Sequence, residues 1–298
     1  MPFSNILLGG DLNIIRLKRD NGCFLSYQLN GVRKYDIAKV AQGVSVVHLY
    51  GESLKKIQVS ICSEKEQEKI ANFLSLLDER IATQNKIIEK LESLIRGLKN
   101  RLFSECFADE KLIPLKNISS IISRKDDGNA DYPVMMITAE YGFINQRERY
   151  NNDNAGSSLA KYTLLKQGEL AYNRGSSKSK KYGSVFYLNV PNALIPYVYH
   201  SFSINSQSCD AKFYAYLLNS KLLDKEFRKV ISSTARMDGL LNISKQDFFS
   251  IKIPFPKLER QKFISSLLST LVQRLNLEKD LKTEYQKQKQ SLLKQMFI

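Results

Sequence analysis

The sequence of 298 residues has no tryptophan, only two histidines and only four cysteines. No two cysteines form a C-x-x-C pair, and neither His48 nor His200 belongs to a cluster of metal-binding residue types. This scarcity argues against a zinc site and against a disulfide framework. We expect structural thiols that stay reduced, which is typical of a cytoplasmic protein.

Long apolar runs are also missing. No stretch approaches the roughly 20 apolar residues that a membrane-spanning helix needs. The first residues, MPFSNILLGGDLN, contain neither a basic segment nor a cleavage site, so we expect no signal peptide. We therefore expect a cytoplasmic protein that does not enter the membrane.

The motifs that carry catalytic chemistry are absent as well. The sequence has no G-x-x-x-x-G-K-[ST] loop for nucleoside triphosphates and no G-x-G-x-x-G after a strand. Residues 189–192, N-V-P-N, fail to match the N-P-P-[YF] motif of adenine methylases. Asp126 and Asp127 are best interpreted as a solvated turn rather than a metal site. We expect no catalytic site, no metal and no cofactor.

Acidic residues are too few to balance the basic ones. The sequence has 45 Lys and Arg against 30 Asp and Glu, a formal net charge of +15. Such a charge favours polyanionic partners, nucleic acid first and an anionic membrane surface second. A merely soluble basic protein remains the alternative on charge alone.

One long stretch, residues 64–103, dominates what is present. It has no proline and only one glycine, Gly97. Its apolar residues follow steps of four and three, with Gln84 filling the one gap, which predicts a long helix with a coiled-coil partner. Ser63 and Glu66 form a capping box at its start. The apolar positions are Ile70, Leu74, Leu77, Ile81, Ile88, Leu91, Ile95, Leu98 and Leu102.

This stretch recurs later in the chain. Residues 257–297 align with it at a constant offset of 194 without a gap. Further back, FLSYQLNG (24–31) is similar to FYAYLLNS (213–220). The middle of the second copy is more polar, because Glu278, Lys282 and Lys289 stand where the first copy has Gln84, Ile88 and Ile95. The chain is therefore a tandem duplication, which suggests pseudo-twofold symmetry.

Between the two rods lies a mixed α/β segment, residues 105–256. Strands are expected within 132–144, 168–173, 182–188 and 193–204, and one helix is expected over 210–230. Residues 1–62 make only a thin domain, with possible strands at 13–17 and 57–61. We predict four parts: a partial first domain (1–62), a first long helix (63–104), a complete second domain (105–256) and a second long helix (257–298).

The duplicated pattern resembles the specificity subunit of type I restriction-modification systems. The resemblance covers essentially the whole chain and rests on three stretches: IQVSICSEKEQEKIANFLSLLDERI (57–81), IKIPFPKLERQKFISSLL (251–268), and the helix ends LKNRLF (98–103) and LLKQMF (292–297). Ser60 and Cys62 depart from the family's proline pair, and Arg260 replaces the expected glutamate. The residues that match the family pattern are Gln67, Ile70, Phe73, Leu74, Leu77, Asp78, Ile81, Pro254, Pro256 and Gln261.

The resemblance implies an α+β fold with mixed α/β target recognition domains joined by two long antiparallel coiled-coil helices. It implies a non-catalytic subunit that binds double-stranded DNA and docks methyltransferase subunits, with restriction subunits in the full complex. The front of the first recognition domain is missing, so two-part recognition by a single chain is in doubt. A rearranged subunit that forms a homodimer or is inactive, and a coiled-coil scaffold with basic heads, remain alternatives.

Candidate DNA-binding residues lie in three polar loops of the complete domain. The loop 173–182 joins two predicted strands and carries four cations, although a solvated surface hairpin remains the alternative. The candidates are Asn173, Arg174, Ser176, Lys178, Lys180, Lys181 and Tyr182 in this loop, Arg147, Arg149, Tyr150 and Asn151 in a second, and Arg236 in a third.

The ends of the long helices carry more apolar residues than a two-helix seam needs. We expect them to contact a partner subunit or the α/β domains. The partner-binding candidates are Leu102, Phe103, Leu292, Leu293 and Phe297.

Overall fold

The computed structural model describes residues 12–42, 48–126, 132–139, 141–146, 156–177, 180–205, 207–231 and 240–297. The chain forms two compact units. Unit 1 comprises residues 1–92 and 273–298, and unit 2 comprises residues 93–272. The division into four parts predicted from the sequence cuts the chain differently and stays a prediction.

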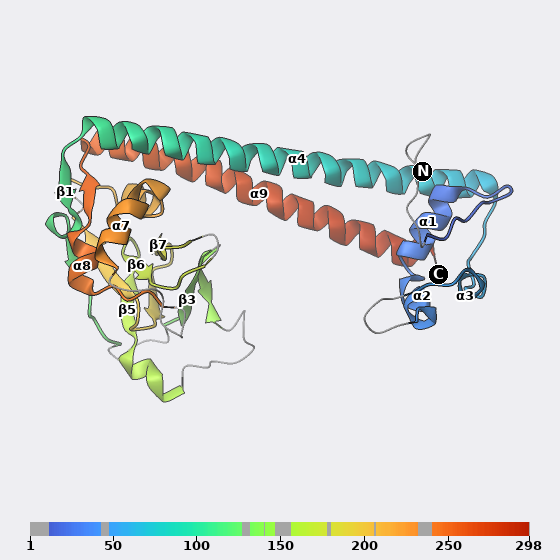
Figure 1. Cartoon of the computed structure of the whole chain (residues 1–298), viewed down its shortest axis with the longest axis horizontal. Helices are drawn as coiled ribbons and strands as arrows, with labels where there is room; N and C mark the ends of the chain where they lie inside the picture. Colours follow the sequence, from blue (N-terminus) through green and yellow to red (C-terminus); the bar gives the residue numbers. More distant parts are fainter. Residues whose placement is uncertain are drawn as a thin grey trace. The chain divides into compact units, whose positions relative to one another are not determined.

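Two long helices contribute to both units. Helix α4 spans Glu64–Asp109 and helix α9 spans Leu258–Met296 (Figure 1). The Ser63 hydroxyl accepts a hydrogen bond from the Glu66 N–H at 3.4 Å, as expected of the predicted cap. Within each unit the two helices run antiparallel, which confirms the predicted fold class.

Unit 1 is helical in its described part. Phe24, Ala71, Leu74, Leu77 and Phe297 form its buried core. The strands predicted at 13–17 and 57–61 are wrong, because in the described residues these extended segments have no strand beside them to complete a ladder. The helices that precede α4 in this unit are α1 (Gly22–Asn30), α2 (Lys34–Val40) and α3 (Gly51–Leu54).

The coiled-coil seam of unit 1 contains one buried polar pair. The Gln84 amide donates to the Glu278 carboxylate and, at 3.1 Å, to the Glu278 backbone oxygen. Arg274 forms an ion pair with the same carboxylate, and hydrogen bonding from Gln84 helps to lower the pKa of Glu278. Gln84 and Glu278 occupy the same position of the repeat, so two equivalent residues contact each other across the seam.

Unit 2 contains the β-structure. Its largest sheet is antiparallel, with strand order β2-β9-β6-β7. Three further antiparallel pairs are β1 with β10, β3 with β4, and β5 with β8. The strands are β1 (Leu112–Pro114), β2 (Ser119–Ile121), β3 (Met135–Thr138), β4 (Gly142–Asn145), β5 (Thr163–Lys166), β6 (Leu170–Asn173), β7 (Ser184–Tyr187), β8 (Asn192–Ile195), β9 (His200–Ile204) and β10 (Lys252–Pro254).

Three short α-helices of unit 2, formed by residues 211–218, 224–230 and 245–250, pack on one face of this sheet around an aromatic cluster. Tyr172 of β6 stacks on Phe248, with ring centroids 4.4 Å apart, and Phe103 from the end of α4 is fully buried in the same core. Together these contacts join the end of one long helix to the sheet. The helices are η1 (Leu115–Asn117), η2 (Gly156–Lys161), α6 (Ala211–Leu218), η3 (Lys221–Leu223), α7 (Asp224–Val230) and α8 (Lys245–Ser250).

The prediction of a single helix over 210–230 is wrong, because helix α6 ends at Leu218. The Asn219 side chain accepts from the Val185 N–H at 3.1 Å and donates to the Val185 carbonyl oxygen. This pairing holds the end of α6 against strand β7. The Ser220 hydroxyl then starts the next turn by accepting from the Leu222 N–H.

The duplication reappears as matching hydrogen bonds in the two units. In unit 2, Gln261 accepts from the Asp210 N–H at 2.8 Å and donates to the Pro256 carbonyl oxygen at 2.7 Å. In unit 1, Gln67 accepts from the Asn21 N–H at 2.8 Å and donates to the Cys62 carbonyl oxygen at 2.9 Å. Each glutamine thus fixes the N-cap of a short helix to the first turns of a long one.

The ends of the long helices repeat as well. Phe297, at the end of α9, packs on Phe24 of α1 with ring centroids 5.0 Å apart. Phe103, in the last turns of α4, packs on Phe213 of α6 at 5.7 Å. Each unit therefore contains the start of one long helix, the end of the other, and one short helix that packs between them.

Candidate nucleic-acid interface

The loop between β6 and β7 is held in place by its first residue, Asn173. The Asn173 amide donates to the Ile137 carbonyl oxygen at 3.0 Å, and its oxygen accepts from the Gly175 N–H at 2.9 Å. Both polar atoms of this predicted DNA-binding side chain are therefore engaged in fixing the loop on strand β3.

The far side of the loop depends on a tight turn. The Lys180 N–H donates to the Ser177 hydroxyl at 3.0 Å, and the Gly183 N–H donates to the Lys180 carbonyl oxygen at 3.3 Å. Gly183 has φ of +79°, and an added Cβ would lie 2.4 Å from the Asn173 carbonyl oxygen. Only glycine fits here without strain.

Tyr182 anchors the end of the loop in the core. Its carbonyl oxygen accepts from the Tyr172 hydroxyl at 2.8 Å, and its ring stacks on Phe227. Lys181 is exposed, with its Nζ 5.6 Å from the centroid of the Tyr182 ring. The predicted residues of this loop thus divide into anchors and side chains that face solvent.

Arg174 and Ser176 lie on the first half of the loop. The Arg174 carbonyl oxygen accepts from the Leu241 N–H at 3.0 Å, which pairs the loop with the segment that follows residue 239. The Arg174 Nε is buried and has no hydrogen-bond partner among the described residues. The exposed Ser176 hydroxyl donates to the Lys181 carbonyl oxygen.

Six of the predicted DNA-binding residues lie outside the described residues. Among the described residues, Gly175 of the loop forms an isolated β-bridge with Leu240, so the first half of the loop lies beside the segment that starts at Leu240. The six residues are Arg147, Arg149, Tyr150, Asn151, Lys178 and Arg236.

Lys99, a half-buried lysine of the long helix α4, lies close to this loop, and sequence reasoning missed it. Burial, and then the charge of Lys180, lower the pKa of Lys99 to about 8. Burial also lowers the pKa of Lys180, although the Asp224 carboxylate opposes the shift. Burial raises the pKa of that carboxyl group. Lys99 lies outside the polar loops, so loop composition gave no signal for it.

His200, on the central strand β9, is buried behind the loop. Its Nε2 lies 3.3 Å from the Ile243 carbonyl oxygen, while its Nδ1 has no partner in the described part of the chain. Burial, together with the positive charges of Arg174 and Lys245, lowers the pKa of His200 to about 4, although the hydrogen bond with the Ile243 carbonyl oxygen opposes the shift. At neutral pH this histidine is an uncharged core residue.

The predicted partner-binding residues differ in burial. Phe103 and Phe297 are 0% and 3% exposed, so their rings are used inside the two units. Leu102, Leu292 and Leu293 are half-buried and pack at the edges of the same cores. Partner contact by these residues stays a prediction.

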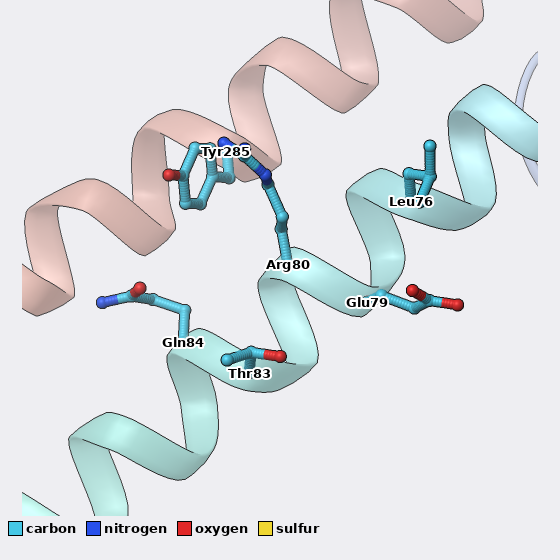
Figure 2. Close-up of a pocket in the computed structure, with 6 residues that line it drawn as sticks. All are labelled: Leu76, Glu79, Arg80, Thr83, Gln84 and Tyr285. Carbon is cyan, nitrogen blue, oxygen red and sulfur yellow. The ribbon is translucent and has the colours of Figure 1, made fainter.

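A groove of about 460 Å³ lies on the coiled coil of unit 1 (Figure 2). Figure 2 shows Arg80 of α4 reaching toward Tyr285 of α9, and the guanidinium carbon lies 5.8 Å from the ring centroid. Leu76, at the edge of the groove, is 60% exposed. The groove therefore combines a cation, an aromatic ring and an exposed apolar side chain.

The described residues form neither a metal cluster nor a membrane-spanning helix. Those residues contain no group of three or more His, Cys, Asp or Glu side chains arranged to hold a metal ion. None of their helices has both the length and the apolar character needed to cross a membrane.

Comparison with known proteins points to one family. The model of the type I restriction modification DNA specificity domain matches residues 7–93 and 110–286. The two matches reproduce the duplication seen in the sequence and in the paired hydrogen bonds of the two units.

Individual relatives agree with this match. The chain is 26% identical over 301 residues to the type I restriction enzyme MjaVIII specificity subunit of Methanocaldococcus jannaschii, covering 91% of this chain and 68% of the relative. It is 22% identical over 300 residues to the putative MjaX specificity subunit of the same organism, covering 91% of this chain and 66% of that relative. The chain thus spans about two thirds of the length of these relatives.

The fold is shared with a solved structure. The S subunit of the type I restriction-modification system from M. genitalium superposes with a TM-score of 0.64 at 20% identity, covering 93% of this chain and 72% of that one. The family match, the curated relatives and the shared fold lead to one conclusion. The chain belongs to the family of type I restriction-modification DNA specificity subunits.

Proposed function

We propose that the chain is the sequence-specific DNA-binding subunit of a type I restriction-modification complex, and that it positions methyltransferase subunits on a target site. The observation that carries this proposal is the basic loop 173–182, whose first residue, Asn173, is hydrogen-bonded to strand β3 of unit 2 while Lys181 faces solvent. Methylation and cleavage then belong to partner subunits, and we place the complex in the cytoplasm.

The loop chemistry supports contact with both the DNA backbone and base edges. A lysine ammonium neutralises phosphate as a point charge, whereas an arginine guanidinium can bond a guanine edge through two donors. We assign Lys181 to the backbone and Arg174 to base reading. Lys178 of the same loop remains a predicted contact, as do Arg147, Arg149, Tyr150 and Asn151 of a second loop and Arg236 of a third.

Methyltransferase subunits are proposed to dock on the long helices. In unit 1 these helices expose large apolar side chains, including Leu76 and Leu277 at 60% and 64%. The groove beside Arg80 and Tyr285 adds a shaped surface (Figure 2). Apolar patches of this kind support protein contact. Because Phe103 and Phe297 are buried, Leu102, Leu292 and Leu293 are the better candidates at the helix ends, and restriction subunits would join the full complex.

The experiment co-expresses the chain with the methyltransferase subunits of its own system, purifies the complex and maps methylated sites in genomic DNA. We expect methylation at one target sequence. Arg174→Gln should relax the target or weaken methylation about 10- to 100-fold, as expected for loss of one base contact. Arg96→Gln, an exposed change on α4, is the matched control. Methylation that needs no chain, or that shows no preferred sequence, would refute the proposal.

A second arrangement is a homodimer of the chain within the complex. It is favoured because the described part of unit 1 contains no strand, so each chain supplies one sheet-based DNA reader. Two identical readers require a target with two identical half-sites. Light scattering of the complex and the symmetry of the mapped site decide this point. One copy of the chain with an asymmetric site excludes the dimer and leaves the first proposal standing.

A further inference from the structure

The two units share a lysine–tyrosine contact. In unit 1, the Lys289 Nζ lies 5.2 Å from the ring centroid of Tyr27. In unit 2, the Lys99 Nζ lies 5.3 Å from the ring centroid of Tyr216. Tyr27 and Tyr216 are equivalent in the repeat, and each receives its lysine from the long helix that ends in its unit. The duplicated core thus holds an ammonium group over the same ring twice.

The charge balance around this contact differs between the units. In unit 1, Asp78 forms an ion pair with Lys289 and accepts the Tyr27 hydroxyl at 2.8 Å. The position equivalent to Asp78 in unit 2 is Val272, and the Tyr216 hydroxyl lies 3.3 Å from the Ser269 hydroxyl instead. Among the described residues, Lys99 takes part in no ion pair. The positive charge that unit 1 neutralises is left uncompensated in unit 2.

A second ammonium group reaches the same region. The Lys180 Nζ lies 3.5 Å from the carbonyl oxygen of Asn219, which follows Tyr216 by one helical turn at the end of α6. Lys180 also feels the charge of Lys221, and one carboxylate, Asp224, faces these lysines. Lys99 and Lys180 are both half-buried and contact the same helix one turn apart, and Asp224 is the carboxylate that acts on Lys180.

We propose that Lys99 of α4 and Lys180 of the β6–β7 loop together bind one backbone phosphate of duplex DNA. A phosphate supplies the negative charge that Val272 fails to provide, and it removes the repulsion between the two ammonium groups. Contacts to phosphate fix the register of a protein on the duplex without reading its sequence. The long helix thus contributes directly to positioning the reading loop.

This inference rests on the proposed function, and its test uses the chain in complex with its methyltransferase subunits. The dissociation constant for a duplex that carries the mapped target is measured from 50 to 200 mM salt. The slope of log K against log salt is negative, and loss of one phosphate contact reduces its magnitude by about 0.9. The affinity ratio of wild type to Lys99→Gln should therefore narrow by about 3.5-fold across this range. Lys99→Arg should retain the wild-type slope.

Three further variants sharpen the test. Val272→Asp gives Lys99 a carboxylate like that of Asp78 in unit 1, and it should reduce the magnitude of the slope as Lys99→Gln does. Lys289→Gln, the matched change in unit 1, should leave the slope unchanged. The double variant Lys99→Gln with Lys180→Gln should reduce the magnitude of the slope no further than either single change, because both lysines bind the same phosphate. Thermal melting checks that each variant folds.

The outcomes separate the two hypotheses. If the wild-type complex binds no duplex, the proposed function fails. If it binds duplex with an unchanged slope in both Lys99→Gln and Val272→Asp, the phosphate site is wrong and the proposed function stands. If the double variant reduces the magnitude of the slope by about 1.8, the two lysines bind two separate phosphates, and the shared site is refuted.

Discussion

Replacing the amide of Gln261 by an apolar group should destabilise unit 2 strongly, because this amide bonds three backbone groups. This side chain is fully buried at the start of α9. Its oxygen accepts from the Asp210 N–H at 2.8 Å, and its amide donates to the Ser208 and Pro256 carbonyl oxygens at 3.2 and 2.7 Å. Gln261→Met keeps the volume and leaves three backbone groups without their partner.

The expected loss is about 3–5 kcal/mol, since each buried group that loses its partner costs about 1–3 kcal/mol and water can reach some of them. The matched change in unit 1 is Gln67→Met, which should cost less. Gln67 bonds two backbone groups, but its third contact is the Asp20 carboxylate, which is only part-buried and can turn to water.

Native-state amide hydrogen exchange measures both losses, because it reports local opening in each unit separately. In Gln261→Met the amide of Asp210 should exchange at least 100-fold faster, while the amide of Asn21 keeps its protection. In Gln67→Met the pattern should reverse. A loss below about 1 kcal/mol at Asp210 would show that the three contacts are replaced by water at no cost, and it would refute the reasoning.

Three further predictions concern other sites. Gln84→Leu alone should lower the melting temperature of the chain, because the buried Glu278 carboxylate loses its amide donor, whereas the double change to Leu at both positions should leave it equal or higher. The pKa of His200 is lowered to about 4 in the folded state, so the unfolded state binds more protons below pH 6.5 and the free energy of unfolding decreases as the pH is lowered. By pH 5 the loss should reach about 2 kcal/mol. His200→Phe should remove this component from a pH series of melting curves. Gly183→Ala should weaken duplex binding and lower the melting temperature through a strained turn, while Gly97→Ala, where nothing lies within 4 Å of the added Cβ, should raise stability by about 1 kcal/mol.

The long helices could be predicted from sequence because their signal is repeated and local. The seam from Ile70 to Leu102 sets the helix period over many turns, and its recurrence at an offset of 194 supplies the partner. Strands β6 and β7 were also predicted near their true bounds, since short β-rich runs flank a polar loop. The helix expected over 210–230 failed because Asn219 bonds Val185, a contact 34 residues away in sequence.

The candidate site was predictable in part. The cations of loop 173–182 are visible in the sequence, but the structural use of Asn173 depends on strand β3, which no local pattern reveals. Arg260, a departure from the family pattern, removes a cap at α9. It forms ion pairs with Glu105 and Glu110 near the end of α4 instead, so the substitution exchanges one terminal interaction for another.

The duplication gives these two units an internal comparison. Where both copies keep a feature, as with Gln67 and Gln261, the common requirement is the fold, because unit 1 keeps it without a sheet in its described part. Where the copies differ, as with Asp78 and Val272, one unit has a carboxylate that pairs with its lysine and the other folds without it. Lys289 shows that a neutralised ammonium group is compatible with the tyrosine contact, so the uncompensated charge of Lys99 is not needed for packing. A charge that packing does not need, placed beside the basic loop of the sheet-bearing unit, is best explained by an anion that arrives from outside.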